Sequence, residues 1–189
     1  MTEVIKHTKH ARRVTARCVV AFTFLLILFQ VSAQNNTLPE YNIKAVFLYN
    51  FTQFVEWPEN TLVNDEAFII GILGTDPFQS YIDETVSGEK VKGHTILVQR
   101  YNTIKDIGKC HILFISNSEA GRVKEILAAV PNKKVLTVSD IPDFARTGGM
   151  IRFMKLNNKI KLQINRSAVK AAELSISSKL LRLADIVGK

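Results

Sequence analysis

Residues 67–78 read "AFIIGILGTDPF", and this stretch decides the class of fold. Its first seven residues form an unbroken apolar run, which is typical of a strand buried on both faces. Gly74 ends the run, and Thr75 or Asp76 can cap a helix in whose first turn Pro77 is well placed. A buried strand that leads directly into a helix predicts one unit of a parallel sheet covered by helices.

The same order of strand and helix returns further along the chain. Apolar runs of strand length recur, and segments with helical signals follow them. The further predicted strands are residues 94–100, 111–116 and 134–140, and the predicted helical segments are 78–86, 103–107 and 119–129. The sequence therefore predicts an α/β fold with a mostly parallel sheet covered by helices on both faces.

Upstream, "YNIKAVFLYNFTQFVEWP" (residues 41–58) predicts the first helix of the domain. The side chains Ile43, Phe47, Phe51 (or Asn50) and Phe54 recur after three or four residues, and Pro58 ends the pattern. Polar residues interrupt the segment too often for a membrane span. Because an aromatic row at helical spacing usually lies in a core, we expect this helix to pack on the sheet.

The end of the chain departs from the strand–helix order. Residues 150–165 alternate around Asn157 and Asn158, which predicts a C-terminal β-hairpin. Gly148 and Gly149 are expected to supply a turn with positive φ before it. We expect Ile160, Leu162 and Ile164 to face inward and Lys159, Lys161 and Gln163 to face outward. Asn165 is expected to cap a final helix from Ser167 to Ile186.

The first 33 residues have the plan of a secretory signal peptide. Basic residues precede an apolar run at 18–29, small residues follow it, and cleavage is predicted after Ala33. This run makes about 18 Å of helix, against a hydrocarbon core of about 30 Å. We therefore expect an exported protein, with an uncleaved signal anchor as the alternative. Residues 34–39 are predicted as a linker and 40–189 as a single domain.

The net charge of +8 falls to +4 once the signal peptide is removed, because five of 25 basic residues and one of 17 acidic residues leave with it. No basic run with interleaved aromatics remains, so nucleic-acid binding is not indicated. Cys110 is then the only cysteine, which excludes an internal disulfide and a cysteine-based metal site. It opens an apolar run, so we expect a buried, inert thiol; a redox or dimer-bridging thiol is the alternative.

The sequence contains no GxSxG, HExxH, Walker or GxGxxG motif. It therefore predicts no catalytic residue, no metal ligand and no cofactor, and indicates a protein that is not an enzyme. The ends of parallel strands are where sheets of this type bind ligands. The candidate ligand-binding residues are Gly74, Thr75, Asp76, Ser116 and Asn117.

Five segments, in the same order, resemble the YfiR family. They are "YNIKAVFLYNFTQFVEWP", "GILGTDPF", "CHILFIS", "GGMIRF" and "IKLQINRSAVKAAELSISSKLLRLA". The resemblance covers about residues 41–184. It implies a periplasmic, non-catalytic regulator that binds and represses an inner-membrane signalling protein of the diguanylate cyclase type. Through cyclic-di-GMP, such a protein affects exopolysaccharide and biofilm formation.

The implied partner is the periplasmic sensor region of a membrane receptor, a diguanylate cyclase or a sensor kinase, and a homodimer is expected. Tyr49 and Trp57 are candidates for the partner surface, since aromatics are favoured at interface centres. The chain departs from the family in having one cysteine where redox-controlled members have pairs, and in Glu173, where a small residue is usual. A periplasmic small-ligand binder is the alternative, and an unrecognised enzyme comes third.

Overall fold

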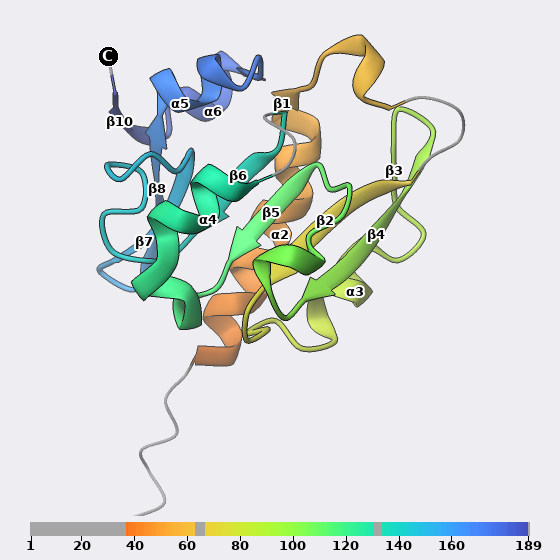
Figure 1. The fold of residues 1–189 in the computed structure, drawn as a ribbon, viewed down its shortest axis with the longest axis horizontal. Helices are drawn as coiled ribbons and strands as arrows, with labels where there is room; N and C mark the ends of the chain where they lie inside the picture. The colour runs from red at the N-terminus through yellow and green to blue at the C-terminus, as the bar shows by residue number, and fades with distance from the viewer. Residues whose placement is uncertain (1–36, 63–66, 131–133, 189) are drawn as a thin grey trace, which may run out of the picture. The chain divides into compact units, whose positions relative to one another are not determined.

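The computed structural model describes residues 37–62, 67–130 and 134–188 (Figure 1). In these ranges eight strands form one sheet in the order β10-β8-β7-β6-β5-β2-β4-β3. They are β2 (Phe68–Leu73), β3 (Lys90–Val91), β4 (His94–Tyr101), β5 (Ile112–Ile115), β6 (Leu136–Ser139), β7 (Ile151–Leu156), β8 (Lys159–Asn165) and β10 (Ala184–Val187). A separate antiparallel pair joins β1 (Val55–Glu56) to β9 (Ser175–Ile176).

The sheet is mostly parallel, as predicted. Strands β4, β2, β5, β6 and β7 run parallel to one another in this order, and β10 runs parallel to β8. Within this described sheet, only the β7–β8 hairpin and the short β3–β4 pair are antiparallel. The α-helices are α2 (Thr37–Phe54), α3 (Tyr81–Val86), α4 (Val123–Ala129), α5 (Arg166–Ala171) and α6 (Ser178–Leu181). The 3-10 helices are η2 (Glu59–Thr61), η3 (Ile104–Asp106) and η4 (Asn117–Arg122).

Helices cover both faces of the sheet, which explains why β2 is buried along its whole length. On one face the α2 side chain Phe51 is fully buried in a core shared with Ile70 and Ile72, and its ring stacks on that of Phe153 at 6.0 Å. On the other face α4 packs through Ile126. Figure 1 shows α4 in front of the sheet and α2 behind it. The aromatic row of the first helix therefore packs on the core as expected, with Phe51 buried and Phe47 and Phe54 partly buried. The prediction is wrong for Ile43, which is 48% exposed.

Two glycines allow aromatic rings to lie against the backbone. A Cβ at Gly71 would lie 2.7 Å from Cε2 of Tyr101, and one at Gly149 would overlap the ring of Phe144. The positive φ expected before the hairpin occurs at Gly148, at +117°. Gly148 is therefore needed for its backbone conformation, and Gly149 for the space that it leaves to a ring.

The hairpin forms where the sequence predicts it, with both turn residues, Asn157 and Asn158, at positive φ. Leu162 and Ile164 face the core. The prediction for Gln163 is wrong, because its side chain is buried and its Nε2 donates a hydrogen bond to Oδ2 of Asp185, 2.8 Å away. The reason is that β10 pairs with the outer side of β8, so β8 is not an edge strand.

The single final helix predicted from Ser167 to Ile186 is also wrong. Two short helices, α5 and α6, flank β9, and the segment ends in β10. After α5 the chain turns at Glu173, whose φ is +58°, and Ser177 then caps α6. Leu174 and Ile176 are buried two residues apart, which is strand spacing inside an apolar pattern that also fits a helix.

Helix α2 begins at Thr37, inside the segment predicted as a linker. The predicted signal peptide and residues 34–36 lie outside the described residues. Among the helices that the structure describes, none combines the length and apolar character needed to cross a membrane.

Candidate functional site

The ends of β2 and β5 bring together most of the candidate ligand-binding residues. Leu73 and Ile115 are partners in the parallel register, so the residues that follow them lie side by side. Gly74 adopts a φ of +88°, and the backbone N–H of Thr75 donates to Oγ of Ser118 at 3.0 Å. Ser116 is buried beside this turn, whereas Asn117 is exposed.

The space beside this turn is taken by a side chain of the protein itself. Glu119 is only 7% exposed, and a Cβ at Gly74 would lie 2.9 Å from its Oε1. Its Oε2 accepts a hydrogen bond from Nη2 of Arg122 at 2.6 Å. An anion at this turn would first meet the carboxylate of Glu119. The arrangement therefore favours a closed strand–helix connection over a ligand site.

Asp76 organises the chain between β2 and α3. Its Oδ1 accepts from the backbone N–H of Phe78 at 2.7 Å, and its Oδ2 lies 2.7 Å from Nε of Arg100. Arg100 donates hydrogen bonds to both Asp83 and Asp76, and the bond to Asp83 has the larger effect. These bonds raise the pKa of the guanidinium, which stays charged. These contacts give Asp76 a structural role at the turn.

The two aromatic candidates for a partner surface differ in exposure. Tyr49 is half-buried, and its hydroxyl donates to Oε2 of Glu89 at 2.7 Å, which raises the pKa of the phenol. Trp57 is only 8% exposed, and its ring meets that of Phe68 edge-on at 5.0 Å. Trp57 is therefore a core residue with little surface to offer a partner.

The Cys110 thiol is buried, with 2% of the residue exposed. Burial raises its pKa to about 12, so the thiol stays protonated at neutral pH. Since the thiolate is the reactive form, this environment favours the inert thiol over the redox thiol.

A charged cluster joins the start of α2 to the end of β6. Nζ of Lys44 lies 2.7 Å from Oε1 of Glu40 and 2.7 Å from Oδ2 of Asp140, which also accepts from the Tyr41 hydroxyl at 2.8 Å. Nζ of Lys155, on β7, lies 2.9 Å from Oε2 of Glu40. Lys44 is almost fully buried, so these pairs fix α2 on the sheet. No sequence pattern indicated that Lys44 and Asp140 meet.

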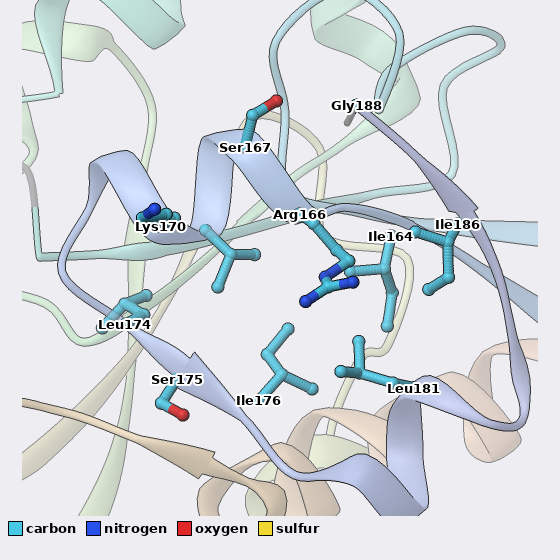
Figure 2. Close-up of a pocket in the computed structure, with 11 residues that line it drawn as sticks. Ile164, Arg166, Ser167, Lys170, Leu174, Ser175, Ile176, Leu181, Ile186 and Gly188 are labelled. Atoms are coloured by element: carbon cyan, nitrogen blue, oxygen red, sulfur yellow. The ribbon is translucent and has the colours of Figure 1, made fainter.

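The C-terminal segment lines an open hollow of about 650 Å³, which we call the C-terminal hollow (Figure 2). Helix α5, β9, α6 and β10 surround it, and β8 contributes Ile164. Its apolar side chains include Ile164, Val169, Leu174, Ile176, Leu181 and Ile186. Figure 2 shows the side chain of Arg166 extending into the middle of this ring.

Asn165 closes one side of the C-terminal hollow. Its Oδ1 accepts from the backbone N–H of Ala168 at 3.0 Å and from the Ser167 hydroxyl at 2.9 Å, which makes it the N-cap of α5 as predicted. Its Nδ2 donates to the carbonyl of Ala145 at 2.7 Å. A Cβ at Gly188 would overlap Oδ1 of Asn165, so the end of β10 approaches the cap closely.

Sequence reasoning missed this hollow because it treated residues 167–186 as one helix. One signal pointed away from that helix: the apolar residues Leu174 and Ile176 are two positions apart, which is the spacing of a strand. Within the described ranges, no group of three or more His, Cys, Asp or Glu side chains is placed to hold a metal ion.

A family model described as YfiR/HmsC-like matches residues 41–185. The chain belongs to the YfiR/HmsC-like family. The matched residues of this chain include the charged cluster except Glu40, and the lining of the C-terminal hollow except Ile186 and Gly188.

No curated protein matches the chain. One similar solved structure is described as the ABC domain in complex with L-Trp from Streptococcus pneumonia. It is 12% identical, the similarity covers 64% of this chain and 55% of that one, and the TM-score is 0.46.

Proposed function

We propose that this YfiR/HmsC-like protein is a periplasmic, non-catalytic regulator that binds and represses an inner-membrane signalling protein of the diguanylate cyclase type. The observation that carries the proposal is the family match over residues 41–185, almost the whole described domain. The predicted signal peptide supports export to the compartment where such a receptor presents its sensor region.

Repression by such a protein is a difference in affinity between two states of the receptor. A partner that binds both states with equal affinity does not shift the equilibrium between them. To move the ratio of active to repressed receptor from 99:1 to 1:99, the partner must bind the repressed state about 10⁴-fold more tightly. The nucleotide is made in the cytoplasm, so the coupling has to pass through the receptor's transmembrane helices. We also propose that the protein acts as a homodimer, which its molar mass in solution would test.

The surface next to the C-terminal hollow supports a role in protein contact. Strand β10 is at the edge of the described sheet, where backbone groups on its outer side have no strand partner. Leu183 is 74% exposed and Ile186 is 40% exposed. An exposed edge with apolar side chains is a frequent feature of surfaces that bind other proteins.

The decisive experiment crosslinks the protein in intact cells, purifies it from membranes and identifies what is attached. We expect a membrane signalling protein with a periplasmic region, and a rise in cellular cyclic-di-GMP when the gene is deleted. A protein recovered without any receptor, together with unchanged cyclic-di-GMP after deletion, would contradict the proposal.

A further inference from the structure

We propose that the C-terminal hollow is a binding site for a compact apolar carboxylate, with Arg166 as the residue that binds the carboxylate group. Its volume of about 650 Å³ lies inside the range of roughly 300–1,000 Å³ that is common for small-molecule sites. One continuous segment of the chain, from Ile164 to Gly188, contributes all of the lining residues.

The walls of the C-terminal hollow are suited to an apolar body. Val169, Leu174 and Ile176 are 5%, 6% and 9% exposed and belong to the core that continues beneath the hollow. Leu181 and Ile186 stand on the opposite side, where Figure 2 shows their side chains directed toward the centre. An apolar group that entered this ring would lose contact with water on several sides, at about 25 cal/mol per Å² buried.

The guanidinium of Arg166 lies at the centre of the hollow (Figure 2), so the polar part of a ligand should be negatively charged. Arg100 and Arg122 pair with carboxylates of the chain itself. Arg166 is exposed and makes no ion pair with any residue that the structure describes, and Figure 2 shows its side chain extending into the hollow. A guanidinium presents a planar fork of N–H donors that fits one carboxylate with two parallel hydrogen bonds.

The geometry favours a monoanion over other ligands. A cation would be repelled by Arg166, and a neutral apolar molecule would leave the guanidinium partly desolvated without a partner. Lys170 also lines the hollow, but Figure 2 shows its amino group away from the central position of Arg166. A single central cation matches one negative charge better than the double charge of a phosphate ester.

Occupancy of the hollow also suggests a regulatory role, and this part rests on the proposed function. Ile186 lies both in the lining of the hollow and on β10, the edge strand that we propose as a contact surface. A ligand that holds this strand would change the affinity for a receptor, and the receptor would change the affinity for the ligand by the same factor.

Calorimetric titration of the purified mature protein with octanoate tests the site directly. We expect one octanoate per chain, at least tenfold weaker binding of octanol and no binding of octylamine. Arg166→Gln should weaken octanoate binding about 10- to 100-fold, as expected for a lost charged hydrogen bond. Lys105→Gln, which removes an exposed cation on η3, should leave it unchanged.

Ile186→Asn provides a second variant, at a partly exposed position where folding is expected to survive. It should weaken the binding of octanoate and should not strengthen the binding of octanol. Octanoate that fails to bind, or that binds Arg166→Gln as tightly as the wild type, overturns the site. Tighter binding of octyl phosphate than of octanoate overturns the carboxylate assignment. Because no receptor is present in the titration, its outcome is independent of whether the protein represses a cyclase.

Discussion

Glu173 occupies a backbone conformation that suits glycine, with a φ of +58° between α5 and β9. Left-handed backbone costs a residue with a Cβ about 1 kcal/mol or more. Glu173→Gly should therefore raise the free energy of unfolding by about 1 kcal/mol in urea titrations. Glu173→Ala keeps the Cβ and removes the exposed pair with Lys134, so it should give no gain. Equal stability of the Gly and Ala variants would show that the turn is not strained.

Glu40 makes stability depend on pH at the acidic end. Burial alone would raise the pKa of its carboxyl, but Lys44 and Lys155 outweigh that effect and hold the pKa below its usual value. A carboxyl whose pKa is lower in the folded than in the unfolded chain stabilises the fold at pH values above its unfolded pKa. This stabilisation is lost as the pH falls through its folded pKa. The wild type should therefore lose more stability between pH 6 and pH 3 than Glu40→Gln. Thermal unfolding across this range, with Glu56→Gln as the exposed control, measures the difference.

At the scale of elements, Asn165 joins the β7–β8 hairpin to α5 and to the loop at Ala145. Asn165→Ala removes the cap and leaves a buried carbonyl without its donor, so we expect a loss of about 2 kcal/mol in unfolding free energy. Asn165→Ser keeps a hydroxyl acceptor for the cap and loses the bond to Ala145, so it should cost less. A serine variant as unstable as the alanine variant would assign the effect to the Ala145 contact alone.

Elements whose pattern allows one interpretation were predictable from sequence, and those whose pattern allows two were not. The unbroken run at 68–73 admits only a buried strand, and the Asn157–Asn158 turn admits only a hairpin. In the last segment, by contrast, Val169, Ile176 and Leu180 fit helical spacing, and their true elements depend on pairing with β1 and β8. The candidate site could not be predicted for the same reason. The hollow exists only because that segment breaks into four elements.

At the scale of the whole molecule, the two outer regions of the sheet present exposed leucines in different settings. Leu183 precedes β10, beside the C-terminal hollow, whereas Leu97 lies on β4 near the other edge. If repression uses the β10 surface, Leu183→Asp should abolish it and raise cellular cyclic-di-GMP to the level of the deletion strain. Leu97→Asp, at a residue that is 47% exposed, should retain repression.

Both aspartate variants should be checked for unchanged unfolding temperature, since each adds a charge at an exposed position. If folded Leu183→Asp still represses fully, the receptor does not bind the β10 surface. Loss of repression in both variants would indicate a contact that extends over more of the molecule.

The hollow and its rim come from one uninterrupted run of chain, which has a consequence for how the family diversifies. Its exposed lining residues Arg166, Lys170 and Ile186 can change without disturbing the interior, whereas Val169, Leu174 and Ile176 belong to the core shared with β2 and β6. If the hollow binds a ligand as proposed, exchanging only those exposed residues between two members of the family would transfer the preference for a small molecule.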